Sequence, residues 1–228
     1  MSKQLHSAFN EILKMPYFEN ERARSGKTIN GHEDAIAVRF TDQGFEHLVN
    51  DKYPTLGKTL VHAWAKTNHD PDFLREEFGS MPLGSFIEQP AGTQSFPDFL
   101  LRDFNDRFLA IEAKSGQDGR CPMWNDNMPK HGAIYILSSG KLDETTVFLG
   151  EDVISTAVYD IKAQQEEEID SIVRKYNKLM ESADSHNRGW IAKSRRQHFQ
   201  AGGMEKTNYF THSDRNKCEQ NVLDKVKI

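Results

Sequence analysis

The chain has almost no cysteine. Only Cys121 and Cys218 occur in 228 residues, too few for a disulfide framework, and Cys218 does not stand at zinc-ligand spacing from any histidine. Long apolar runs are lacking too: no stretch approaches the length of a membrane span, and the N-terminus has no apolar segment typical of a signal peptide. These absences predict a cytoplasmic protein in a reducing compartment, without a membrane partner.

A glycine-rich phosphate loop is also missing. The nearest candidate, RSGKT at 24–28, lacks the first glycine of a Walker motif and any preceding strand. No order of serine, histidine and aspartate suggests a nucleophilic triad. The chain is therefore not expected to bind a nucleotide cofactor or to use ATP for movement along DNA.

An overall positive charge is lacking, but the charge is unevenly distributed. The net charge is −5 with a pI near 6.0, yet residues 188–217 hold seven Lys or Arg against two acids, a net of +5. A basic segment on an acidic body is typical of a surface that meets a polyanion. A solvated basic face is the alternative, and charge alone does not decide between them.

Apolar spacing divides the chain into helical and extended parts. Helical spacing predicts helices over 5–18, from 32 to Gly44 with Ile36, Val38 and Phe40 inward, in pieces within 52–81, and over 218–226. Between 99 and 149 the apolar residues form four short runs separated by turn-forming residues, which predicts four successive strands. We therefore expect an α/β fold with a central mixed sheet flanked by helices, in one domain over 1–228.

A long helix is predicted over 153–182, because one apolar stripe recurs along it. The stripe consists of Ile161, Gln165, Ile169, Ile172, Tyr176, Leu179 and Met180. We favour packing of this stripe on the sheet of its own chain, and the alternative is a contact between two copies.

The stretch SFPDFLLRDFNDRFLAIEAKSG at 95–116 combines a β-hairpin pattern with charges. Asp98 lies on one arm, and Glu112 and Lys114 lie on the other, at positions where a charge is costly unless it is paired or holds a metal. Glu112 and Lys114 share one strand face, while Ala113 points to the core and its carbonyl stays available. Carboxylate oxygens are the ligands that Mg²⁺ prefers, so the trio predicts metal-assisted phosphodiester hydrolysis.

The length of the hairpin loop decides whether Asp98 joins this site. A two-residue loop at Asn105-Asp106 would place Asp98 opposite Ala113, on the wrong face. We therefore predict a three-residue loop, a bulge or a splayed strand end. An edge ribbon with gatekeeping charges is the structural alternative to a catalytic hairpin.

The order Pro97-Asp98, then Glu112-Ala113-Lys114, resembles the PD-(D/E)XK signature of type II restriction endonucleases, and the resemblance covers the chain from Pro90 onward. It implies a restriction-endonuclease-like core, with Asp98, Glu112 and the Ala113 carbonyl as Mg²⁺ ligands and Lys114 as the water-orienting base. A further acid on a helix before the sheet is common in the family, and we assign it to Glu33, with Glu46 as the second choice. A first-turn acid that stabilises its helix is the alternative for Glu33.

The resemblance also implies double-stranded DNA as substrate, 5′-phosphate and 3′-hydroxyl products, and a homodimer. The residues expected to contact DNA are Gln94, Asn125, Lys130, Arg188, Lys193, Arg195, Arg196 and His198, most of them in a basic, loop-rich segment at 186–217. Trp190 and Phe199 are expected to anchor this segment to the core. A repair or junction-resolving nuclease of the same fold and a non-catalytic DNA-binding module remain the alternatives.

Overall fold

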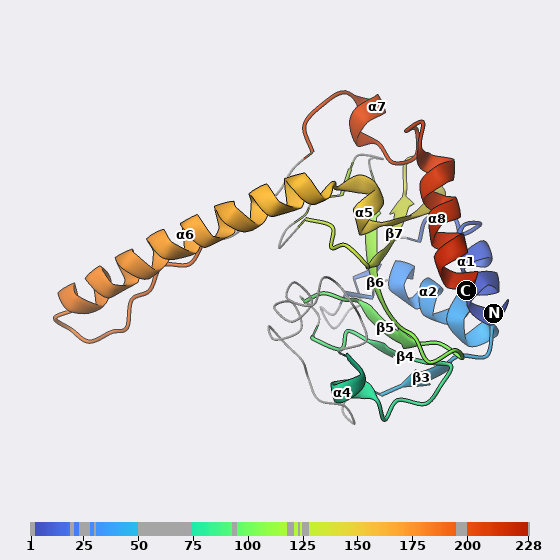
Figure 1. Cartoon of the computed structure of the whole chain (residues 1–228), viewed down its shortest axis with the longest axis horizontal. Coiled ribbons are helices and arrows are strands. Elements are labelled where there is room, and N and C mark those ends of the chain that lie inside the picture. The colour runs from blue at the N-terminus through green and yellow to red at the C-terminus, as the bar shows by residue number, and fades with distance from the viewer. Residues whose placement is uncertain are drawn as a thin grey trace. The chain divides into compact units, whose positions relative to one another are not determined.

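The structure is a computed structural model that describes residues 3–18, 21–22, 28–29, 31–49, 74–92, 95–117, 121–122, 124, 128–194 and 200–227. The predicted helical pieces within 52–81 therefore lie partly outside the described residues. The helices are α1 (Lys3–Ile12), α2 (Gly31–Asp42), α4 (Leu74–Phe78), α5 (Gly150–Val153), α6 (Thr156–Ala183), α7 (Met204–Thr207) and α8 (Arg215–Lys227) (Figure 1).

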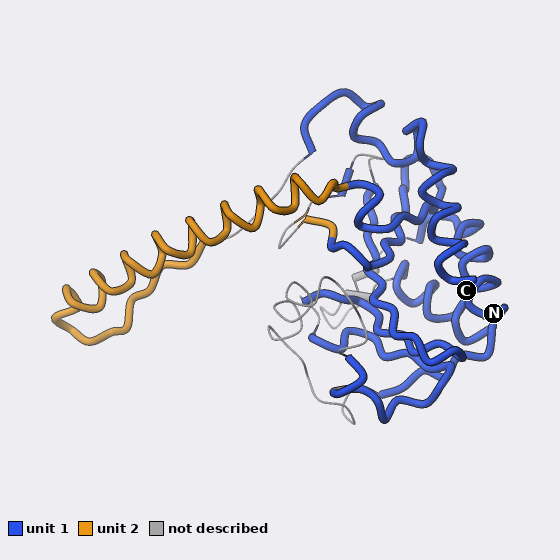
Figure 2. Tube along the Cα trace, viewed as in Figure 1, with its two compact units in different colours: residues 1–122, 130–153, 200–228 blue, residues 123–129, 154–199 orange. Residues whose placement is uncertain are grey.

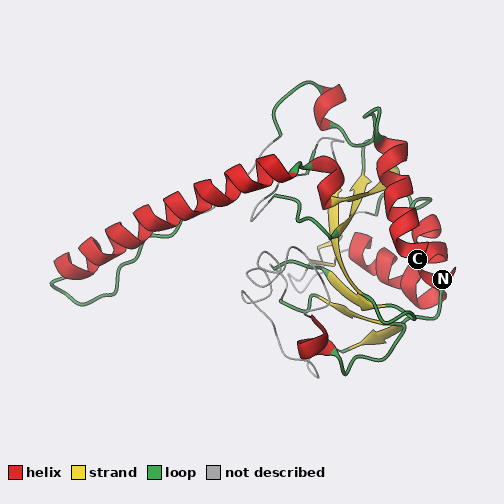
Figure 3. Ribbon diagram, viewed as in Figure 1, coloured by secondary structure: helices red, strands yellow, loops and turns green. Residues whose placement is uncertain are grey.

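A six-stranded mixed sheet forms the centre of the fold, in the order β3-β4-β5-β6-β7-β8 (Figure 3). Its strands are β3 (Glu46–Leu48), β4 (Ser85–Glu88), β5 (Phe99–Arg102), β6 (Phe108–Gly116), β7 (Ile134–Ser139) and β8 (Glu144–Leu149). The pairs β3/β4 and β6/β7 are parallel and the other three are antiparallel. A separate antiparallel ribbon joins β1 (Glu21–Arg22) to β2 (Thr28–Ile29). The α/β class and the mixed sheet are confirmed.

Alternate residues of the sheet build the core under α1, α2 and α8. Side chains such as Phe99, Ile111 and Ile136 pack with Phe9 and Phe40 from the helices in one buried cluster. Figure 1 shows these three helices together on one side of the sheet, beside both chain ends. Because strand side chains alternate between faces, the residues between these core positions point away from the helices. Glu112 and Lys114 occupy such positions.

Four of the six strands were predicted, and two were missed. β5 to β8 coincide with the four apolar runs, while β3 and β4 have only three and four residues. In β4 the first three side chains are all buried, so the alternation typical of a half-exposed strand is lacking. Strands this short carry too few side chains to produce a recognisable pattern.

Two helix predictions need correction. α1 ends at Ile12 rather than near residue 18, because Pro16 disfavours helical backbone at the residue before it. Val38, expected to point inward, is exposed, whereas Ile36 and Phe40 are fully buried. α2 ends before Gly44, as predicted, and Gly44 takes a left-handed conformation with φ of 86° that a glycine adopts without strain.

The chain divides into two compact units (Figure 2). Unit 1 comprises 1–122, 130–153 and 200–228 and holds the sheet; unit 2 comprises 123–129 and 154–199 and holds α6. The single domain over 1–228 stays a prediction, since this division does not establish whether either unit folds alone. Among the described residues, no helix combines the length and the apolar character needed to cross a membrane.

Candidate active site

The β5–β6 hairpin brings Asp98 to the same face as Glu112. The register pairs Phe99 with Ile111, so Asp98, directly before β5, lies opposite Glu112 when the pairing is continued by one residue. Directly opposed residues share a face of the sheet. Lys114 follows two residues later on that face, so both arms contribute charges to one place.

A three-residue loop produces this register. Phe104, Asn105 and Asp106 form the loop, which is closed by the backbone N–H of Asp103 donating to the Arg107 carbonyl at 2.9 Å. Asp106 takes a left-handed conformation with φ of 64°, as expected for the last residue of such a loop. We predicted a three-residue loop, a bulge or a splayed strand end, and the structure has the three-residue loop.

The carboxylate of Asp98 is anchored to the opposite strand. Its Oδ2 accepts a hydrogen bond of 2.8 Å from the backbone N–H of Ala113. The pKa of Asp98 is raised to about 8, chiefly by burial and also by the negative charges of Glu112 and Glu33, against opposing contributions from Lys114 and the Ala113 N–H. Asp98 therefore lies close enough to Glu112, Lys114 and Glu33 to interact electrostatically with each of them.

Glu112 and Lys114 form an ion pair within one strand. The Nζ of Lys114 donates to Oε1 of Glu112 at 2.5 Å, and both side chains are largely buried. Burial lowers the pKa of Lys114, but the carboxylates of Glu112 and Asp98 outweigh it, and the net pKa is raised. Lys114 is therefore an ammonium at neutral pH, which donates hydrogen bonds and offsets negative charge.

The other oxygen of Glu112 is the most informative atom of the site. Oε2 is buried without a hydrogen-bond partner among the residues that the structure describes. A buried carboxylate oxygen without a donor is costly, and a cation would satisfy it. Ala113 is buried, as predicted, and its N–H points toward Asp98. Because the carbonyl of a strand residue faces the same neighbouring strand as its N–H, the Ala113 carbonyl also faces the side of Asp98. Two carboxylates and this carbonyl fit the partial, hard-oxygen shell that Mg²⁺ accepts.

A fuller protein shell is not seen. Among the described residues, no group of three or more His, Cys, Asp or Glu side chains is placed to hold a metal ion.

Glu33 reaches the same neighbourhood from the first turn of α2. Its Oε2 accepts a hydrogen bond of 3.1 Å from Nε2 of Gln89, and its charge raises the pKa of Asp98. The structure thus brings Glu33 near the hairpin acids, in accord with the residue's expected place. The second choice, Glu46, is an exposed residue of β3.

Sequence reasoning missed a further acid, Glu88 at the end of β4. Burial raises its pKa, partly opposed by His47 at 3.5 Å, and Asp34 and Glu33 raise it further. The neighbouring Gln89 continues the pairing with β5, because its N–H donates to the Asp98 carbonyl at 2.6 Å. No motif marked these residues, because both belong to the unpredicted strand β4 or its end. Glu88 pairs with Phe99, whose side chain lies in the helix-side core, so Glu88 shares that face and not the face of Asp98.

His32, next to Glu33, is buried in the interior. Burial lowers its pKa to about 4, with a smaller opposing contribution from the backbone of Ile136. It is therefore neutral at physiological pH and supplies no charge, and both of its ring nitrogens are buried without a hydrogen-bond partner among the described residues.

The structure describes three of the eight predicted DNA-contacting residues. Gln94, Asn125, Arg195, Arg196 and His198 lie outside the described residues. Arg188 and Lys193 are exposed and belong to unit 2, whereas residues 200–217 of the predicted basic segment belong to unit 1.

The side chains of Lys130 and Trp190 also differ from expectation. Lys130 is buried, with its Nζ 4.8 Å from the centre of the Phe96 ring, so it does not lie on the open surface typical of a phosphate contact. Trp190 was expected to anchor the basic segment, but it is 71% exposed. Phe199 lies outside the described residues.

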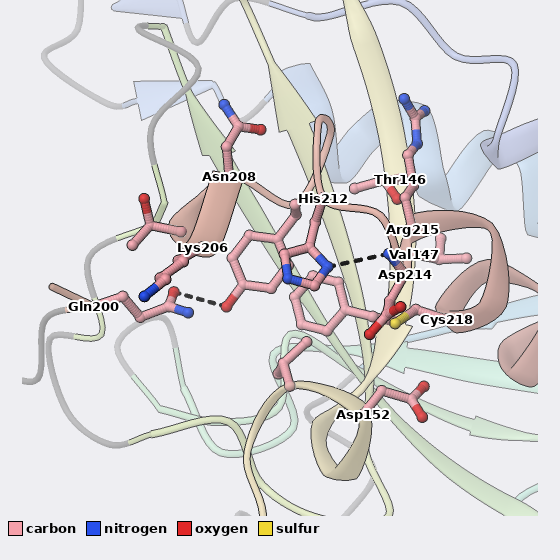
Figure 4. A pocket seen from close by; sticks show the side chains of 14 residues that line it. Thr146, Val147, Asp152, Gln200, Lys206, Asn208, His212, Asp214, Arg215 and Cys218 are labelled. Carbon is pink, nitrogen blue, oxygen red and sulfur yellow. Dashed lines mark hydrogen bonds between the residues drawn. The ribbon is translucent and has the colours of Figure 1, made fainter. Parts of the chain in front are cut away.

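A pocket of about 130 Å³ lies in unit 1, between β8, α5 and residues 200–218 (Figure 4). None of the predicted site residues lines it. Tyr209 stacks on Phe148 at 4.6 Å, and Phe148 stacks on Tyr135, which pairs with Glu112 in the sheet register. A row of aromatic rings therefore leads across the sheet face from the acidic site to this pocket.

Comparison of the chain with protein-family models, with curated proteins and with solved structures finds no match. A functional conclusion therefore depends on the chemistry of the hairpin and its neighbours.

Proposed function

We propose that the chain is a Mg²⁺-dependent endonuclease of the type II restriction class, with a restriction-endonuclease-like core that cuts double-stranded DNA. One observation carries the proposal. Asp98 lies opposite Glu112 through a three-residue loop, and Glu112 keeps a buried oxygen without a partner. An edge ribbon would not need to place two largely buried carboxyl groups, those of Asp98 and Glu112, beside one lysine.

The residues have distinct roles in this proposal. Asp98, Glu112 and the Ala113 carbonyl would hold Mg²⁺, which supplies an acidified water and offsets charge on the phosphate. The Lys114 ammonium orients that water by donating to it and stabilises negative charge on the phosphate oxygens. Glu33 provides a further carboxylate near Asp98, and the hydrogen bond that it accepts from Gln89 holds it in place. Hydrolysis would leave a 5′-phosphate and a 3′-hydroxyl.

DNA would be held by the exposed basic residues, among them Arg188 and Lys193, through phosphate contacts. A homodimer would let one copy cut each strand of a palindromic site. A repair or junction-resolving nuclease with the same catalytic residues is the second candidate, and the same hairpin chemistry supports it.

The test is digestion of a sequenced phage genome with purified protein, in Mg²⁺ and in EDTA. We expect discrete Mg²⁺-dependent fragments, which Lys114→Ala abolishes and the matched control Lys141→Ala, at an exposed turn, preserves. Thermal melting of both variants checks that the fold is kept.

Other results would redirect the proposal. Mg²⁺-dependent cutting without discrete fragments would favour the repair or junction-resolving nuclease. Salt-sensitive DNA binding by folded wild-type protein without any cutting would show that the hairpin charges are structural.

A further inference from the structure

Exposed apolar side chains gather on unit 2. Of the twelve large hydrophobic side chains that are exposed among the described residues, seven lie on α6 or the segment after it. They are Val158, Ile161, Ile172, Tyr176, Leu179, Trp190 and Ile191, between 44% and 71% exposed. Single exposed apolar residues are normal on a protein surface, but a contiguous group marks an interaction site.

The five side chains on α6 form one narrow stripe. At about 100° per residue, positions 158, 161, 172, 176 and 179 fall within about 60° of the helix circumference. The segment after α6 runs back along the helix (Figure 2) and is fixed there by two hydrogen bonds between the Asn177 side chain and the Ala192 backbone, at 2.6 and 3.2 Å. It covers the neighbouring side of α6, where Val173 and Met180 are half-buried, and leaves the stripe exposed.

The charge of α6 reverses along its length. Glu166, Glu167, Glu168 and Asp170 make the middle of the helix acidic, and Arg174, Lys175 and Lys178 make the next turns basic. The helix dipole does not account for this order, because its effect is confined to the first and last turn. Glu168 and Lys175 both lie along one edge of the apolar stripe, by helical position.

We propose that the occupant of this stripe is α6 of a second copy of the chain, in antiparallel orientation. A twofold axis at Ile172 places the acidic half of each helix against the basic half of the other. It sets Glu168 beside Lys175 of the second copy and Gln165 against Leu179 of the second copy. The isologous contact closes after two copies, so it yields a dimer rather than a fibre.

The charges also argue against other occupants. Nucleic acid and anionic membranes repel the acidic turns at Glu166–Asp170, which an antiparallel helix of the same sequence attracts. The inference goes beyond the proposed nuclease activity and does not depend on it, because its readout is the mass of the protein in solution.

The first experiment measures the mass of the full chain by analytical ultracentrifugation over a range of concentrations. We expect a dimer that Ile172→Asp weakens by about 100-fold or more, because an aspartate at the centre would bury a carboxylate without a partner in each copy. Leu83→Asp, at an exposed apolar residue of unit 1, is the matched control and leaves the dimer unchanged. A monomeric wild-type protein, or a dimer indifferent to Ile172→Asp, overturns the proposal.

Charge exchange tests the pairing itself. Glu168→Lys sets lysine against lysine and weakens the dimer about tenfold, and Glu168→Lys with Lys175→Glu restores it to within about threefold. Glu181→Lys makes the same charge change on the opposite side of α6 and has no effect. Failure of the double variant to restore the dimer overturns the antiparallel register.

Disulfide trapping tests the orientation. With Cys121 and Cys218 replaced by serine, mixed chains carrying Gln165→Cys and Leu179→Cys form a cross-linked heterodimer if the helices are antiparallel. Cross-linking of Gln165→Cys chains alone, without the mixed product, would show parallel helices and contradict the proposal. Nuclease activity enters none of these measurements, so failure here leaves the proposed cleavage chemistry at Asp98, Glu112 and Lys114 untouched.

Discussion

At the scale of single residues, two buried groups near the candidate site make stability depend on pH in opposite directions. Asp98 has its pKa raised to about 8, chiefly by burial, and His32 has its pKa lowered to about 4 by burial. In both cases the neutral form is favoured in the folded chain. The stabilising contribution of Asp98 is full below its unfolded pKa, near 4, and is lost as the pH rises to 8. That of His32 is full above its unfolded pKa, near 6.5, and is lost as the pH falls to 4.

Asp98→Asn should therefore stabilise the ligand-free protein. Asparagine keeps an oxygen for the N–H of Ala113 but needs no proton to stay neutral. We expect the free energy of unfolding in EDTA to rise by about 2 to 4 kcal/mol at pH 7.5, with the gain shrinking toward pH 5. Urea unfolding of the variant and the wild-type protein at several pH values measures this gain in free energy. Mg²⁺-dependent cleavage should be lost in the same variant. A variant less stable than wild type at pH 7.5 would contradict the raised pKa.

His32→Leu should flatten the acid side of the stability profile. Between pH 7 and pH 5 the wild-type protein loses about 2 kcal/mol through protonation of His32 in the unfolded state, and leucine cannot take up that proton. The comparison uses the difference between the two pH values for each protein, so a constant packing change from the substitution cancels. Equal pH differences in both proteins would show that His32 is not held neutral in the fold.

At the scale of elements, the β5–β6 loop decides whether a site exists at all. Asp103 is fully buried and holds the loop: its Oδ1 accepts the backbone N–H groups of Asn105 and Arg107, each at 2.9 Å. Its Oδ2 pairs with the Arg107 guanidinium, which also donates to the Lys225 carbonyl in α8. One carboxylate thus fixes both the loop and its connection to the last helix.

Asp103→Ala should lower the free energy of unfolding by about 3 kcal/mol or more, since it leaves two backbone N–H groups and a guanidinium without their acceptor. Asp103→Asn, which keeps one acceptor oxygen, should lose about half as much. Urea unfolding of the two variants measures the difference. Equal losses in both would mean that packing, rather than hydrogen bonding, stabilises the loop.

The same hairpin shows how far sequence patterns reach at this scale. Its strands were predicted because their apolar residues gather in runs. A three-residue loop, a bulge or a splayed strand end was predicted because a two-residue loop would place Asp98 on the opposite face from Glu112. β4 was missed, because four residues with no alternation resemble any short apolar stretch. Glu88 was missed with it.

At the scale of the whole molecule, the large buried core belongs to unit 1. Every residue of the main hydrophobic cluster lies in that unit, whereas α6 buries only Lys162 among its side chains. Local opening is cheapest where few apolar contacts must be broken. Unit 2 should therefore open more readily than the sheet, as long as the protein is too dilute to self-associate.

Brief trypsin digestion at low concentration should cut unit 2 first, at sites such as Arg174, Lys175 and Arg188. The remaining fragments should stay associated and melt within a few degrees of the intact chain, because the core is untouched. Mass spectrometry identifies the cuts, and Lys141, in an exposed turn of unit 1, serves as the internal reference. Cuts at Arg102 in β5 or Lys114 in β6 at an equal rate would contradict this order of stability.

The sequence by itself determined the α/β class, the strands β5 to β8, the long helix and the placement of Glu112 and Lys114 on one strand face, because each follows from local periodicity. The tertiary structure decided what depends on residues far apart in sequence. It set the register between Asp98 and Glu112, brought Glu33 close to the site, buried Lys130, and left the stripe of α6 exposed. Periodicity shows which side of an element is apolar, but only the arrangement of the elements determines what that side meets.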